Sequence, residues 1–112
     1  MQSAAGALDP MLAILAKFHS PLHLESEILL LFSLLDVDDS LSLSFQEMHE
    51  GLESLPLNPV VHMSIDDWDN LTMNGAMLDH EGCLHVDEFQ KAIRWQLMLY
   101  GQRMLGFRQR QV

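Results

Sequence analysis

The side chains best suited to chemistry lie in one short acidic segment, residues 36–47. Oxygen-bearing residues stand at every second position and again at its end: Asp36, Asp38, Ser40, Ser42, Ser44 and Glu47. A hard divalent cation takes about six to eight oxygen ligands, and alternating short polar side chains can wrap them around one ion. No nucleophile, base and orienting group form a recognisable arrangement, so we expect a cation site and not an enzyme.

The segment resembles the twelve-residue loop of the EF-hand calcium-binding superfamily, with Phe32 before it and Met48 after it at that family's apolar positions. The resemblance implies that Ca²⁺ is the bound ion. It implies side-chain ligands from Asp36, Asp38 and Ser40, a carbonyl ligand from Ser42, a direct or water-mediated ligand from Ser44, and a bidentate grip by Glu47. It also places Leu43 in the core, where two such loops pair as short strands.

One position departs from the family pattern. The sixth loop residue is Leu41, where the family prefers glycine because the turn needs a positive φ angle. That conformation costs a residue with a β-carbon about 1 to 2 kcal/mol, which corresponds to roughly a tenfold loss of affinity. We therefore expect Leu41 to weaken Ca²⁺ binding without abolishing it.

A degenerate copy of the loop spans residues 77–88, and matching Asp36 to Met77 gives a repeat period of 41 residues. Methionine at the first position offers no hard oxygen, and His85 at the ninth is a poor calcium ligand. We expect this loop to brace the first through an antiparallel contact of Leu43 with Leu84. A longer loop that uses carbonyls from residues 74–77 is the alternative, and a zinc or copper site at His80, Cys83 and His85 is disfavoured for want of a fourth ligand.

Helix signals surround both loops. Three residue pairs are typical of helix N-termini: Asp9 before Pro10, Ser20 before Pro21, and Ser64 with Asp67. Apolar spacing predicts helices over 9–18, 21–35, 45–55, 65–76 and 86–104. The fold class is therefore all-α, an EF-hand pair with an extra N-terminal helix. The expected divisions are 1–19 (N-terminal segment), 20–55 (first EF-hand), 56–64 (linker), 65–106 (second, degenerate EF-hand) and 107–112 (basic tail).

Charge is divided along the chain. The net charge is −10, all 16 acidic residues lie at or before Glu88, and five of the six basic residues lie from Lys91 onward. An acidic body argues against nucleic acid as partner and favours a protein or a basic amphipathic peptide. A single cysteine, Cys83, and apolar runs such as Ile28–Phe32, far shorter than the roughly 20 residues that span a bilayer, predict a cytoplasmic chain without a membrane span.

Two further surfaces are candidates for partner contact. Met48, Met73 and Met98 fall on helices predicted to face a shared groove, with simple core packing as the alternative. The segment 91–110 is both basic and apolar: before Tyr100 we expect a core face, and from Arg103 to Arg110 a partner contact. Residues 96–103 are similar to segments that follow EF-hands in cytosolic regions of some protist and algal cation channels, which implies a regulatory segment of a larger protein.

Two functions of different kinds remain open from the sequence. The first is a calmodulin-like regulatory or sensor module that couples Ca²⁺ in the loop 36–47 to protein contact. The second is a calcium-independent interaction scaffold, which Leu41 and Met77 favour because each departs from the binding pattern.

Overall fold

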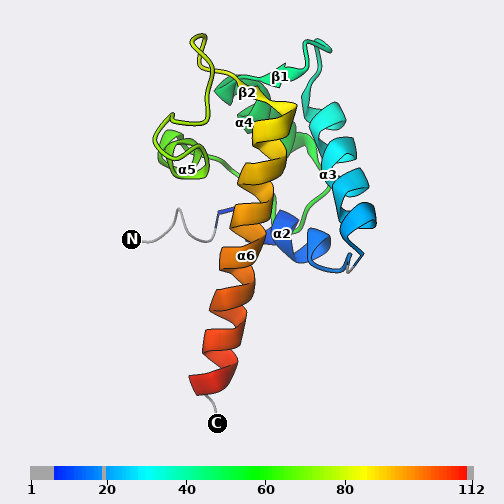
Figure 1. Ribbon diagram of the computed structural model, residues 1–112, viewed down its shortest axis with the longest axis vertical. Coiled ribbons are helices and arrows are strands. Elements are labelled where there is room, and N and C mark those ends of the chain that lie inside the picture. Colours follow the sequence, from blue (N-terminus) through cyan, green and yellow to red (C-terminus); the bar gives the residue numbers. More distant parts are fainter. Residues whose placement is uncertain (1–6, 19, 111–112) are drawn as a thin grey trace.

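The computed structural model describes residues 7–18 and 20–110, with the backbone alone in 105–110. This part of the chain is mostly helical and carries one small antiparallel sheet (Figure 1). Its elements are α2 (Asp9–Leu15), α3 (Pro21–Leu35), β1 (Ser42–Leu43), α4 (Phe45–Ser54), α5 (Ile65–Leu71), β2 (Leu84–His85) and α6 (Val86–Arg110). No helix among these described residues is long and apolar enough to cross a membrane.

Serine side chains cap the N-termini of three helices: Ser20 at α3, Ser44 at α4 and Ser64 at α5. Ser20 accepts a hydrogen bond from the His23 amide ahead of α3, and Ser64 forms a reciprocal capping box with Asp67 at α5, as predicted. Such caps satisfy amide groups that a helix leaves without partners at its first turn. The prediction for Asp9 is wrong: Leu8 is the N-cap of α2, and Asp9 instead accepts a 2.6 Å ion-pair hydrogen bond from Arg103 of α6.

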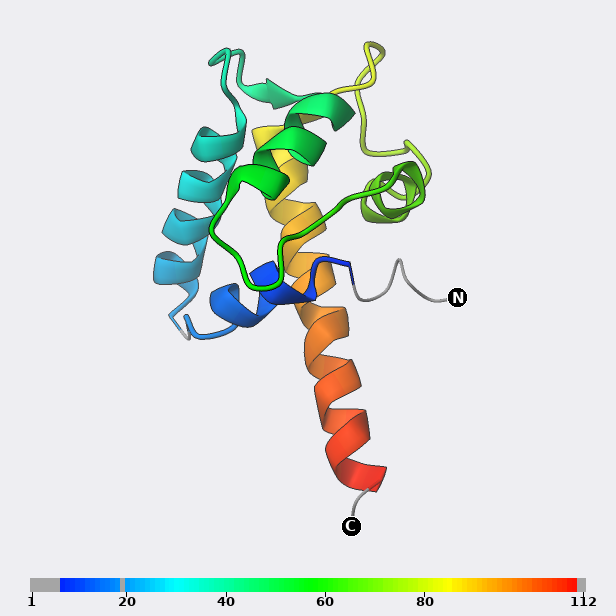
Figure 2. The same cartoon turned by 180° about the vertical axis from the view of Figure 1, so that it is seen from behind.

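Two helices differ in length from the predicted ones. α5 ends at Leu71 and not at residue 76, because Met73, Asn74 and Gly75 have φ angles of 56°, 57° and 87°, which no right-handed helix accommodates. α6 continues to Arg110, beyond residue 104, so Gly101 does not end it. Figures 1 and 2 both show the C-terminal half of α6 extending past α2 and away from the rest of the molecule.

The sheet joins the two loops in the predicted register. Leu43 lies opposite Leu84 and Ser42 opposite His85 in an antiparallel pair. Both leucine side chains are fully buried, while His85 is exposed. Because adjacent residues on a strand point to opposite faces, this register directs both leucines inward to one core. The pairing therefore ties the loop 36–47 to the rest of the chain.

One core connects the two halves of the molecule. Phe32 of α3 meets Phe89 of α6 edge to face, with ring centroids 5.2 Å apart. The apolar face of α3 is buried at Ile28, Leu31, Phe32 and Leu35, with Leu24 partly buried at its rim. α2 packs against α3 and α6 and buries its own apolar residues, Met11, Leu12 and Leu15, in the same core.

The methionines do not line one groove. Met48 is completely buried in the core, whereas 58% of Met73 and 44% of Met98 are exposed. Met48 is therefore core packing, which was the alternative interpretation. Arg103 is likewise engaged within the chain, because it pairs with Asp9 and lies 5.8 Å from the centre of the Tyr100 ring.

Candidate metal centre

Three carboxylates meet between the end of α3 and the beginning of α4. Asp36 is the C-cap of α3, Asp38 follows it in the loop, and Glu47 lies in the first turn of α4. One oxygen of each side chain lies within 4.8 Å of the others, and no other such acidic, histidine or cysteine group occurs among the described residues. Negative groups held this close repel one another, so the arrangement favours a cation between them.

The loop serines and backbone hold these carboxylates in place. Asp36 accepts hydrogen bonds from the Ser40 amide at 3.2 Å and hydroxyl at 3.3 Å, and from the Leu41 amide at 2.8 Å. The Ser40 hydroxyl also lies 3.1 Å from the Ser42 carbonyl oxygen. The Ser40 amide also donates a hydrogen bond to Asp38 at 3.1 Å. Asp36, Asp38 and Ser40, which were predicted to supply the first ligands, therefore belong to one hydrogen-bonded set with Ser42 beside them.

Glu47 is positioned by a capping box. Its Oε1 accepts a hydrogen bond from the Ser44 amide at 3.1 Å, and Ser44 Oγ accepts one from the Glu47 amide at 3.1 Å. The box occupies one carboxylate oxygen with a backbone donor while the side chain remains beside Asp36 and Asp38. Glu47 therefore serves both the helix start and the acidic cluster.

The backbone has the predicted left-handed turn. Leu41 has a φ angle of 67°, and Asp39 one of 56°. The Leu41 side chain is 63% exposed, so little packing compensates the conformational cost of about 1 to 2 kcal/mol.

Leu41→Gly is expected to raise the free energy of unfolding by up to about 1 kcal/mol. Relief of the left-handed strain exceeds the added chain entropy of glycine, which costs about 0.4 to 1 kcal/mol. Urea denaturation measures the change. Leu41→Ala is the matched control, because it removes most of the same side chain but keeps the β-carbon. Equal stability of the glycine and alanine variants would contradict the strain argument.

The hollow beside the cluster includes residues that sequence reasoning missed. Its volume is about 470 Å³, and Glu50, Glu81 and Cys83 line it together with the predicted loop residues. Glu81 and Cys83 come from the second loop, and the Leu43–Leu84 register was the signal that could have placed them there. A hydrogen bond from Ser40 lowers the pKa of Asp38, while burial and then the charge of Asp79 raise the pKa of the Cys83 thiol.

In the second loop, the carboxylate of Asp79 is hydrogen-bonded within the loop itself. Asp79 accepts hydrogen bonds from the amides of Glu81 at 2.8 Å and Cys83 at 3.0 Å, and its other oxygen lies 2.7 Å from His85 Nε2. Gly82 supplies the positive φ of the turn, at 80°. His85, predicted to be a poor calcium ligand, thus lies against Asp79, the carboxylate at the third position of the loop.

These bonds make the second loop sensitive to acid. The hydrogen bond from the Cys83 amide, followed by that from His85, lowers the pKa of Asp79 to about 2. A carboxylate whose pKa is lower in the folded state stabilises the fold above its unfolded pKa of about 4, and that contribution is lost as the pH falls toward 2. At neutral pH we expect the wild type to have a higher free energy of unfolding than the Asp79→Asn variant. This difference should become smaller as the pH falls from 4 to 2. Urea denaturation across this range measures it; a constant difference would contradict the assignment.

No family model, curated protein or solved structure matches this chain.

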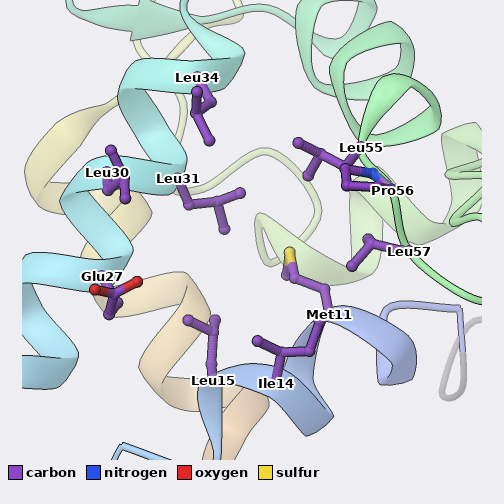
Figure 3. A pocket seen from close by; sticks show the side chains of 10 residues that line it. All are labelled: Met11, Ile14, Leu15, Glu27, Leu30, Leu31, Leu34, Leu55, Pro56 and Leu57. Carbon is purple, nitrogen blue, oxygen red and sulfur yellow. The ribbon is translucent and has the colours of Figure 1, made fainter.

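An apolar hollow lies on the side of the molecule formed by α2, α3 and the segment after α4. Its volume is about 160 Å³. Figure 3 shows Leu30, Leu31 and Leu34 of α3 opposite Leu55 and the residues that follow it, with α2 closing one end. Leu30 and Leu34 are more than half exposed, and Glu27 contributes the one charged group of the lining. Exposed apolar surface of this kind favours contact with another molecule.

Proposed function

We propose that this chain is a regulatory EF-hand pair that binds one Ca²⁺ ion in the loop 36–47. The observation that carries the proposal is the convergence of the Asp36, Asp38 and Glu47 carboxylates within 4.8 Å, in a loop that turns through a left-handed residue. An all-oxygen set with three carboxylates suits a hard cation, and Ca²⁺ tolerates the irregular geometry of such a loop better than Mg²⁺ does.

The positions of the ligands explain how an ion would act on the fold. Asp36 belongs to the end of α3 and Glu47 to the start of α4, so one ion would join the two helices at their adjoining ends. Gly51 of α4 also packs against Leu35 of α3, since a β-carbon there would lie 2.5 Å from the leucine side chain. A change in the angle between these helices would therefore alter the buried packing of Leu35 against Gly51.

The second loop is proposed as a brace and not as a second site. Its Asp79 is occupied by internal hydrogen bonds, and Met77 supplies no hard oxygen side chain. The Leu43–Leu84 pair would hold the first loop in shape while the ion enters. This arrangement supports a stoichiometry of one ion per chain.

The partner we propose is a protein segment that forms a basic amphipathic helix. The apolar hollow beside α3 supplies a hydrophobic surface, and the residues up to Glu88 carry all 16 acidic side chains with Lys17 as the only basic one. Apolar anchors flanked by lysine or arginine would match both features. We place this module in the cytoplasm, as a regulatory part of a larger protein.

Calorimetric titration of the full chain with Ca²⁺, followed in parallel by tryptophan fluorescence, tests the proposal. Trp68 is buried and its ring lies 5.9 Å from that of Phe45, the first residue of α4, so its emission should report movement of that helix. In the Trp95→Phe variant, Trp68 is the only tryptophan, so the fluorescence comes from this residue alone. We expect one ion per chain and a fluorescence change that chelator reverses. If neither Ca²⁺ binding nor a fluorescence change is seen, the proposal that this chain is a calcium sensor is excluded.

A calcium-independent interaction scaffold is the second candidate. Two features favour it: the strained backbone of Leu41, and the hydrogen bonds that occupy Asp79 within the second loop. Both would weaken ion binding by the loops. The scaffold would bind its basic partner equally well with Ca²⁺ and with chelator. The sensor would bind that partner differently in the two conditions.

A further inference from the structure

The C-terminal half of α6 carries a face that its own chain leaves open. Met98, Gly101 and Leu105 follow one another at spacings of three and four residues, which places these positions on one side of the helix. Met98 is 44% exposed, and a β-carbon at Gly101 would meet no other segment of the described structure within 4 Å. Arg94 stands about one turn before these positions and Arg108 about one turn after them. The face is therefore apolar in the middle and basic at both ends.

Gly101 suits this face to close contact with another segment. Glycine destabilises the interior of a helix relative to alanine, and the open space beside Gly101 would accept a larger side chain. Packing within the described part of the chain therefore does not account for the glycine. A residue without a side chain lets a second molecule approach the helix backbone closely.

The apolar hollow between α2, α3 and the segment after α4 has the size for such a helix face. Small-molecule sites commonly have volumes of about 300 to 1,000 Å³, whereas this hollow has about 160 Å³ and so accepts one or two side chains. Figure 3 shows Leu30 and Leu34 of α3 on one side and Leu55 across from them. A helix that binds in a groove inserts apolar side chains spaced three and four residues apart.

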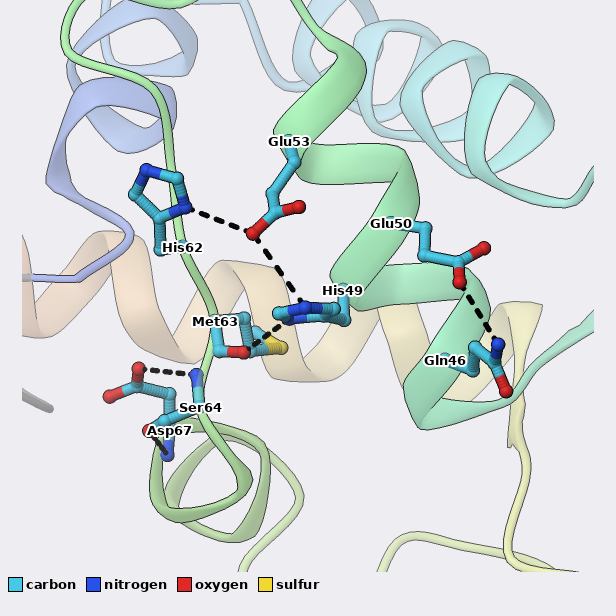
Figure 4. Close-up of polar contacts among 8 residues, drawn as sticks. All are labelled: Gln46, His49, Glu50, Glu53, His62, Met63, Ser64 and Asp67. Atoms are coloured by element: carbon cyan, nitrogen blue, oxygen red, sulfur yellow. Dashed lines mark hydrogen bonds and ion pairs between the residues drawn. The ribbon is translucent and has the colours of Figure 1, made fainter.

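Polar contacts hold one wall of the hollow in place. Residues 55–57 form this wall, and the chain beyond them is tied back to α4 (Figure 4). Glu53 lies 2.9 Å from His62 Nδ1, and His49 Nδ1 donates a 2.6 Å hydrogen bond to the carbonyl oxygen of Met63, which can only accept. The hollow therefore exists before a partner arrives, which lowers the entropic cost of docking.

We propose that the C-terminal half of α6 from a second copy of this chain occupies the hollow, in a two-fold dimer. Residues up to Glu88 carry all 16 acidic side chains and one basic one, whereas residues from Lys91 onward carry five basic side chains and no acidic one. The acidic body of one copy therefore attracts the basic helix end of the other. In a two-fold dimer each helix end meets the other copy's hollow, so the contact forms twice.

Two other arrangements fit these observations less well. α6 is one continuous helix to Arg110, and its C-terminal half extends away from the rest of the molecule in Figures 1 and 2, so it does not reach its own hollow. An antiparallel pair of α6 helices that crossed at Gly101 would place Arg94 of each copy near Arg108 of the other. Like charges at these positions repel each other.

The inference rests on the proposed function in one respect, because it takes the hollow as the docking surface for a basic amphipathic helix. It does not require Ca²⁺ in the loop 36–47. Sedimentation velocity of the full chain over a concentration series, with excess Ca²⁺ and with chelator, tests it. We expect a dimer in at least one of these conditions, with a dissociation constant that rises with salt because salt screens the charge attraction.

Met98→Glu on the helix face and Leu30→Lys in the hollow should each raise the dissociation constant by at least about tenfold. The first change places an acidic group against the acidic body, and the second places a basic group against the basic helix end. Both side chains are more than 40% exposed, so both variants should fold, which circular dichroism checks. Ile65→Lys is the matched control, because Ile65 is 54% exposed but lies on α5 outside the hollow; it should associate as the wild type does.

A mixture of the two variants shows what the helix end contacts. Met98→Glu keeps an intact hollow and Leu30→Lys an intact helix face, so one of the two contacts can form between them. With a fluorescent label on the N-terminal amine of one variant, a heterodimer should appear at concentrations at which each variant alone is monomeric.

A wild type that stays monomeric, a Leu30→Lys variant that dimerises as the wild type does, or a mixture without heterodimer would overturn the inference. A leucine–lysine amphipathic peptide separates this failure from failure of the proposed function. If the wild type is monomeric but binds the peptide, and Leu30→Lys does not, the second copy is excluded while the hollow remains the site for a basic helix.

Discussion

Glu47→Gln is expected to weaken Ca²⁺ binding by at least about a hundredfold, which corresponds to about 2.7 kcal/mol. The substitution removes one negative charge, and with it the carboxylate proposed to bind the ion through both oxygens, from a cluster in which Asp36 and Asp38 are the other acidic members. The fold should survive, because glutamine retains an oxygen that accepts the Ser44 amide in the capping box. Calorimetry measures the affinity, and thermal unfolding checks that α4 remains intact.

Glu50→Gln is the matched control for this effect. It makes the same change in charge one turn further along α4, at a side chain that borders the hollow and accepts a hydrogen bond from Gln46. We expect less than a threefold loss of affinity, since screening by solvent reduces its influence on the ion. If Glu47→Gln and Glu50→Gln behave alike, Ca²⁺ is drawn by the general negative charge and not held by the loop.

Phe89→Ala should lower the free energy of unfolding by about 3 to 5 kcal/mol, the largest stability effect expected here. Phe89 is fully buried and meets Phe32 edge to face, so truncation opens a cavity between α3 and α6. Those helices belong to different halves of the chain. Both halves should therefore lose stability together, in one unfolding transition.

Urea denaturation followed separately by far-ultraviolet circular dichroism and by Trp68 fluorescence measures this effect. Met98→Ala, on the same helix but 44% exposed, should cost less than about 1 kcal/mol. Two separate transitions in the Phe89→Ala variant would show that the halves fold independently. That result would contradict the single core.

Local signals in the sequence predicted much of the fold. Ser20 and Ser64 marked helix starts because a capping side chain acts within three residues of itself. The left-handed φ of Leu41 was predicted from its place in the loop, and the Leu43–Leu84 pair from the spacing of the repeat. The early end of α5 was missed, because Met73 has no intrinsic preference for the left-handed conformation that it adopts.

The sequence by itself determined the helical class, the order of its elements and the residues of the acidic loop, since these depend on neighbours a few positions apart. Only the tertiary structure decided which distant side chains meet. Asp9 is drawn away from capping its own helix by Arg103, 94 positions further along the chain. His49 and His62 converge on Glu53 only because the chain turns back after α4. Such contacts depend on how helices pack, and no local spacing encodes that geometry.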